Sequence, residues 1–110
     1  MVSDAQPCYD LPNNGKMPRI GLGTSVGQDP DDHLKAEKMV YDAIKIGYRH
    51  IDTAAFYDTE PAVGRGIKSA INDGLVTREE LFITTKVWND RHDDVVASCN
   101  ESLERLGLTY

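Results

Sequence analysis

Apolar residues recur every three to four positions in three separate stretches of the chain. The first stretch predicts a helix from about Asp32 to Ile46, with Gly47 as its stop signal. A second predicted helix begins between Thr59 and Pro61, where proline is tolerated in the first turn. A third is expected from about Asp93 to Leu106. The residues expected on the buried faces are Ala36, Met39, Val40, Ala43, Ile44, Val63, Ile67, Ala70, Ile71, Val95, Val96, Cys99, Leu103 and Leu106.

Short extended runs precede the predicted helices. The strands are expected at 20–24 ("IGLGT"), 49–53 ("RHIDT") and 81–87 ("LFITTKV"). A capping box at "TREE", residues 77–80, predicts a single helical turn just before the third strand. Residues 9–20 predict a hairpin around "PNNG", in which Asn14-Gly15 suits a type I′ turn. The strand starts are about 30 residues apart, which is typical of β/α units in a parallel sheet.

Two architectures contain such units, the open doubly wound sheet and the closed eight-stranded barrel. Three units cannot close a barrel, so we expect residues 1–110 to be part of one domain in a fold of about 250 residues. The expected fold class is α/β, an N-terminal hairpin plus the first three units of a (β/α)8 barrel, ending before strand four. The alternative is a complete domain of three units.

Composition excludes several classes of function. The net charge of −6 gives no general attraction to nucleic acid or to anionic membranes. The apolar runs are too short to span a bilayer, and the N-terminal residues show no secretory signal. Cys8 and Cys99 are far apart, which favours reduced thiols in the cytoplasm, with Cys99 in the core. The three histidines lack metal-ligand spacing, so no metal is expected.

Functional groups in parallel α/β folds gather at the carboxyl ends of the strands. Alternation along the second and third strands puts Asp52 and Lys86 on the same inward face, where the two charges would compensate each other. Tyr57 would lie over them, and a nearby ammonium lowers the pKa of a phenol, which suits it to donate a proton. The alternative is an inward salt bridge with a tyrosine packed on the rim.

Other polar and glycine residues admit two interpretations each. "GLGTSVG" does not match a dinucleotide loop, and the acids of "QDPDD" after it would repel a pyrophosphate. Gly21 and Gly23 share one face, leaving space for a flat ring or easing tight packing. Trp88 is either a pocket wall or a packing residue. Glu60 with Asp52 resembles a glycosidase acid pair, but the helix start explains Glu60 better.

The segment "GYRHIDTAAFYDTEPAVG" closely resembles the long motif of the aldo-keto reductase superfamily. "LPNNGKMPRIGLGT" resembles that family's opening hairpin and first strand, and "ELFITTKVWN" its third strand, in the same order. The resemblance implies a (β/α)8 barrel that reduces aldehydes and ketones with NADPH, a small-molecule carbonyl as the substrate, and a full-length form that is a monomer. The catalytic histidine of the family follows the fourth strand, and this chain ends before it.

The resemblance also implies roles for individual residues. Tyr57 would be the proton donor, Lys86 would lower its pKa, and Asp52 would hold Lys86 and approach the nicotinamide ribose. Gly23, Thr24 and Ser25 match the segment that contacts the nicotinamide end of the cofactor, although many members carry an aromatic residue where Ser25 stands. Trp88 matches a position that often lines the substrate pocket.

The sequence therefore supports an NADPH-dependent carbonyl reductase of the aldo-keto reductase type, represented by its N-terminal portion and inactive by itself. The alternative hypothesis is a non-catalytic truncated isoform or binding module. Such a module would associate with other chains through the open edge of its sheet.

Overall fold

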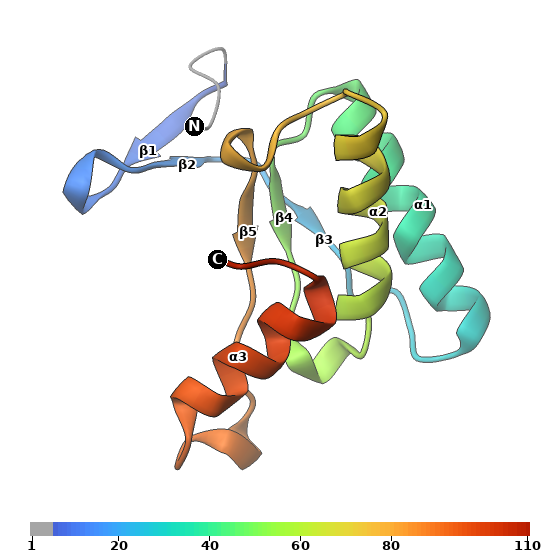
Figure 1. Cartoon of the computed structure of the whole chain (residues 1–110), viewed down its shortest axis with the longest axis vertical. Coiled ribbons are helices and arrows are strands. Elements are labelled where there is room, and N and C mark those ends of the chain that lie inside the picture. The colour runs from blue at the N-terminus through green and yellow to red at the C-terminus, as the bar shows by residue number, and fades with distance from the viewer. Residues whose placement is uncertain (1–5) are drawn as a thin grey trace.

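A computed structural model of the chain describes residues 6–110 (Figure 1). Three parallel strands form one sheet in the order β3-β4-β5, and each strand is followed by a helix. The elements are β3 (Leu22–Gly23), α1 (Pro30–Ile46), β4 (His50–Asp52), α2 (Glu60–Asn72), β5 (Phe82–Thr84) and α3 (Val95–Leu106). The predicted alternation of strand and helix is confirmed, and the fold is α/β. The strands are shorter than expected, and the capping box precedes a 3-10 turn at Arg78–Glu80.

The N-terminal hairpin is present, but its turn differs from the prediction. Strands β1 (Cys8–Asp10) and β2 (Lys16–Pro18) pair antiparallel beside the sheet (Figure 1). The left-handed backbone falls on Asn13 and Asn14, with φ of 67° and 63°, whereas Gly15 is extended with φ of −72°. Asparagine tolerates this region better than most residues. The predicted turn at Asn14-Gly15 was therefore one residue too late.

Helices α1 and α2 lie side by side and cover one face of the sheet (Figure 1). The buried core between them and the strands comprises Val40, Ile44, Ile51, Val63, Ile67, Ala70, Val76, Leu81 and Leu106. The helices approach closely at Gly66, where a Cβ atom would lie 2.6 Å from the carbonyl oxygen of Glu37. The predicted buried faces of α1 and α2 are confirmed, although Met39 and Ile71 are only half-buried.

Both ends of α1 follow from local chemistry. The helix begins at Pro30, two residues earlier than predicted, because Asp29 is its N-cap and forms a capping box with Asp32. It ends at Ile46, and the following residue, Gly47, is its C-cap, with a φ of 121° that glycine adopts readily, as expected. The chain then turns directly into β4.

The predicted buried face of α3 is wrong for three of its five residues. Val95 is 51% exposed, Val96 is 72% exposed, and Cys99 is also exposed, so the expectation of a core cysteine fails. The buried residues of α3 are Ser98, Ser102 and Leu106. The two small serines permit close packing of the helix and Leu106 joins the core, whereas within the described residues nothing covers the more apolar face.

No helix among residues 6–110 combines the length and the apolar character needed to cross a membrane. The expectation that the N-terminus lacks a secretory signal concerns residues 1–10, of which 1–5 lie outside the described range.

Candidate active site at the strand ends

Asp52 and Lys86 form an ion pair at the carboxyl end of the sheet. Asp52 is the last residue of β4 and pairs in register with Thr84, so Lys86 lies two residues beyond the end of β5 on the same face. The Lys86 ammonium donates to the Asp52 carboxylate and, at 3.0 Å, to the carbonyl oxygen of Thr53. The two side chains are 45% and 40% exposed, so the pair lies at an open mouth instead of being fully buried.

Tyr57 lies beside this pair. It ends a short 3-10 turn, Ala55–Tyr57, after which Asp58 takes a left-handed conformation with φ of 57°. The Lys86 Nζ atom is 5.1 Å from the centroid of the Tyr57 ring. The structure thus brings together the acidic, phenolic and ammonium groups that the sequence placed on three separate segments.

Partial burial lowers the pKa of Lys86, but the hydrogen bond and the charge of Asp52 outweigh it, with smaller contributions from Tyr57. The pKa of Lys86 is therefore raised above its ordinary value of 10.5. The ammonium stays protonated at neutral pH, which keeps a positive charge within reach of the Tyr57 ring.

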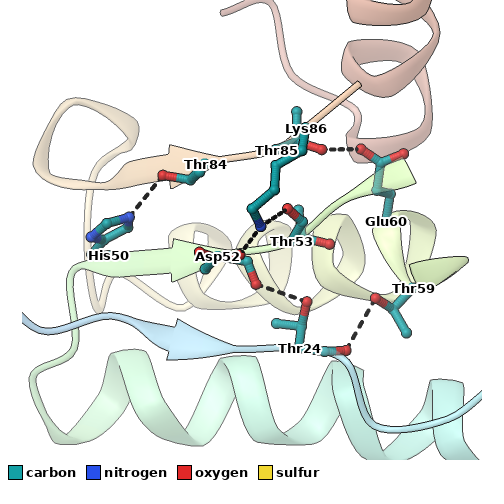
Figure 2. A network of polar contacts seen from close by, with 9 residues as sticks. All are labelled: Thr24, His50, Asp52, Thr53, Thr59, Glu60, Thr84, Thr85 and Lys86. Carbon is teal, nitrogen blue, oxygen red and sulfur yellow. Dashed lines mark hydrogen bonds and ion pairs between the residues drawn. The ribbon is translucent and has the colours of Figure 1, made fainter. Parts of the chain in front are cut away.

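The end of β3 contributes Gly23, Thr24 and Ser25 to the same mouth. Gly23 is the register partner of Asp52, and a Cβ atom there would meet nothing within 4 Å, so open space adjoins the carboxylate. Ser25 is exposed, whereas Thr24 is fully buried and its hydroxyl donates to the Asp52 carbonyl oxygen at 3.0 Å (Figure 2). The space expected beside Gly21 is instead filled, because a Cβ atom there would lie 3.1 Å from His50 Cγ.

Two alternative sites are not formed. The N-terminus of α1 is occupied by the carboxylates of Asp29 and Asp32, which leaves no place for a phosphate after Gly27. Glu60 does not pair with Asp52. It is buried at the start of α2 and accepts hydrogen bonds from Arg105 at 2.8 Å and Thr85 at 2.7 Å.

Glu60 lies at the helix start, as predicted from the sequence, but neither of its two partners was predicted. Thr85 and Arg105 are 25 and 45 residues away along the chain. No local pattern relates residues so far apart. An acid in the first turn of an otherwise apolar helix face was the one available signal.

Trp88 lies two residues after Lys86 and lines a separate groove, which includes none of Asp52, Tyr57 and Lys86. Its ring stacks on that of Phe56 with centroids 3.9 Å apart and an interplanar angle of 17°. The rings are 43% and 48% exposed and border a groove of 340 Å³ that also includes Asp58, Arg91 and Arg105. Both a packing contact and a groove wall are therefore present at Trp88.

The histidines lie elsewhere. His50 has Nδ1 3.1 Å from the Pro18 carbonyl oxygen and Nε2 2.8 Å from the Thr84 hydroxyl (Figure 2). Within residues 6–110 no histidine hydrogen-bonds Asp52, Tyr57 or Lys86. In the same range no three His, Cys, Asp or Glu side chains gather in a way that would hold a metal ion.

Comparison with known proteins gives concordant matches. The profile of the Aldo/keto reductase family matches residues 19–110. The chain is 52% identical to aldo-keto reductase AKR2E4 of Bombyx mori, over 94% of this chain and 35% of that protein. It is 49% identical to the NADP-dependent D-sorbitol-6-phosphate dehydrogenase of Malus domestica, over 91% of this chain and 31% of that protein.

Solved structures agree with these matches. The crystal structure of the Bombyx mori protein in complex with NADP superposes with a TM-score of 0.88 at 50% identity. The superposition covers 96% of this chain and 36% of that chain. The chain thus spans about a third of the length of the relatives it matches.

Proposed function

The chain belongs to the aldo/keto reductase family, and from that premise we propose that it carries the proton-donating part of an NADPH-dependent carbonyl reductase. The hairpin and the three β/α units would take the place of the opening of an eight-stranded barrel. The observation that supports this proposal is the contact of Lys86 with Asp52 and with the Tyr57 ring at the strand ends.

In this proposal Tyr57 is the acid. When bound, NADPH would supply the hydride that reduces the carbonyl carbon. The Tyr57 hydroxyl would give its proton to the carbonyl oxygen, which completes the alcohol. The positive charge of Lys86 would stabilise the negative charge that develops on the Tyr57 oxygen as its proton leaves. Asp52 keeps Lys86 charged and fixed. Trp88, with Phe56, would wall the groove where a small carbonyl substrate enters.

The residues at the end of β3 fit the nicotinamide end of the cofactor. Open space beside Gly23 adjoins Asp52, and Ser25 is exposed next to it. The hydroxyl, N–H and carbonyl groups of Thr24 are all hydrogen-bonded within the protein, so we assign it the task of fixing this strand end under the cofactor. Asp52 would approach the ribose.

The experiment joins residues 1–110 to the remaining part of the Bombyx mori relative and follows NADPH oxidation with a simple aldehyde. We expect Tyr57→Phe to lower kcat by about 10²–10⁴-fold, because the general acid is lost. Tyr9→Phe, on the exposed hairpin, is the matched control and should leave the rate unchanged. An equal rate in Tyr57→Phe would refute the assignment.

We expect the 110 residues alone to show negligible turnover. The family resemblance implies a catalytic histidine beside the tyrosine, and within residues 6–110 no histidine hydrogen-bonds Tyr57. Steady NADPH oxidation by that chain, abolished in Tyr57→Phe, would contradict this expectation. We further propose that the protein lies in the cytoplasm, which the two unpaired cysteines support, and that its full-length form is a monomer.

The alternative is a non-catalytic module that associates with other chains. Strands β3 and β5 form the two edges of the sheet, and Val95 and Val96 are exposed on α3. Sedimentation analysis separates the two proposals, because edge pairing predicts a mass that rises with concentration. A constant monomer mass would count against the module.

A further inference from the structure

Glu60 is a buried carboxylate that the proposed chemistry does not use. It has 0% exposure, and among residues 6–110 it is the one charged residue in the buried set. Burying a carboxylate is costly unless its oxygens find donors. Each oxygen has one here, since Oε1 accepts from Arg105 Nε and Oε2 from the Thr85 hydroxyl.

The contacts of this carboxylate join three elements. Glu60 is the first residue of α2, Thr85 directly follows β5, and Arg105 belongs to the last turn of α3. Arg105 is 38% exposed and is itself held by Ser102 at 3.3 Å. The carboxylate therefore fixes the end of β5 and the end of α3 to the start of α2.

The same helix start is tied to the other two strands. Thr59, the fully buried N-cap of α2, donates to the carbonyl oxygen of Thr24 at 3.2 Å. Thr24 in turn donates to the carbonyl oxygen of Asp52. Figure 2 shows these contacts beside the ion pair: Thr59 meets Thr24, and Glu60, the next residue in the chain, meets Thr85.

Both ends of this network adjoin the proposed catalytic groups. Thr85 immediately precedes Lys86, so the hydrogen bond to Glu60 fixes the backbone from which the lysine extends. Tyr57 is three residues before Glu60, in the turn whose Ala55 N–H donates to the Lys86 carbonyl oxygen at 3.5 Å. A shift of Glu60 would move the supports of Lys86 and Tyr57 together.

We propose that Glu60 is a positioning residue, which holds Lys86 against Asp52 and beside Tyr57 by way of Thr85. This inference rests on the proposed function, because only that proposal makes Asp52, Tyr57 and Lys86 catalytic. A buried ion pair is often no more stable than an apolar replacement of the same volume. Folding stability alone therefore does not explain why a carboxylate occupies this buried position, whereas the orientation of Lys86 does.

The test measures the pKa of Lys86 by NMR in the 110-residue chain labelled with ¹³C-lysine, with the signal assigned by its loss in Lys86→Arg. The pKa reports how closely Lys86 approaches Asp52, and it needs no turnover. We expect Thr85→Val to lower this pKa by about 0.5, because lengthening a half-exposed ion pair by about 1 Å weakens its attraction by that order. Thr85→Ser should restore the wild-type value.

Two controls separate positioning from the local effect of a valine. Thr84→Val is the matched variant on the same strand, whose hydroxyl contacts His50 instead, and it should leave the pKa unchanged. In a Glu60→Leu background, Thr85→Val should add no further change, because leucine offers the Thr85 hydroxyl no acceptor and the contact is already absent. Dispersed spectra show that each variant is folded.

An unchanged Lys86 pKa in folded Thr85→Val would overturn the proposal, and so would strictly additive effects of Thr85→Val and Glu60→Leu. If the Lys86 pKa shifts as expected in folded Thr85→Val, the positioning role of Glu60 holds. If Tyr57→Phe is nevertheless fully active in the protein joined to the Bombyx mori relative, the proposed function is refuted. The two failures are thus distinguishable.

Discussion

Replacing Gly66 by alanine tests whether close packing of α1 on α2 outweighs helix propensity. Gly66 is in the middle of α2, where alanine is favoured over glycine by about 1 kcal/mol. The added Cβ atom would lie 2.6 Å from the Glu37 carbonyl oxygen and 3.0 Å from the Cβ of Val40, which is itself buried. The propensity and the packing therefore predict opposite signs.

Packing should prevail. The nearest atom is a backbone oxygen of α1, which cannot move without displacing the helix, and ordinary contact begins at 3.4 Å, so α1 must shift by 3.4 − 2.6 = 0.8 Å. Overpacking of this kind costs about 1–3 kcal/mol, which leaves a net destabilisation of about 1 kcal/mol after the propensity gain.

Urea unfolding followed by circular dichroism measures this difference. We expect Gly66→Ala to unfold at a lower urea concentration, with an unchanged dependence of the unfolding free energy on urea. Ser69→Ala, at an exposed position of the same helix, is the control and should raise stability by a few tenths of a kcal/mol. A Gly66→Ala protein as stable as the wild type, or more stable, would show that the helices do not meet as closely as described.

Two further predictions concern single side chains. Hydrogen bonds from the Thr77 backbone and hydroxyl lower the pKa of Glu80 from its ordinary 4.5, so its contribution to stability is present above pH 4.5 and is lost as the pH falls through the folded value. Glu80→Gln should therefore be less stable than the wild type at neutral pH, and urea midpoints should converge in acid; a constant difference would contradict this. Cys99 is exposed and Cys8 half-buried, so a thiol reagent should label Cys99 faster, and Cys99→Ser should remove the fast phase; an unchanged fast phase would place the accessible thiol elsewhere.

The sequence predicted what depends on short-range periodicity. Alternation along β4 and the run after β5 put Asp52 and Lys86 on one face, and the ion pair follows from parallel pairing in register. The apolar pattern and the stop signal at Gly47 placed α1 to within two residues, although the capping role of Asp29 was not predicted. These features need no knowledge of distant contacts.

Contacts between distant segments were the part that periodicity could not supply. An apolar stripe on α3 predicted Val95, Val96 and Cys99 as buried, yet the helix packs through Ser98, Ser102 and Leu106. A periodic pattern identifies a face suited to burial, but the partner that meets the helix decides which face is covered.

The position of α3 also shows how helix packing and the proposed site depend on each other. Arg105 reaches Glu60 only from the face that carries Ser102, and rotating α3 to bury Val96 would turn Arg105 away from that carboxylate. Glu60 would then be buried with one donor missing, which costs about 1–3 kcal/mol. The ion pair therefore selects the orientation of α3, and the same orientation supports Thr85 and Lys86. An apolar residue in place of Glu60 would remove this preference, so the strand end at Thr85 and the packing of α3 both depend on this carboxylate.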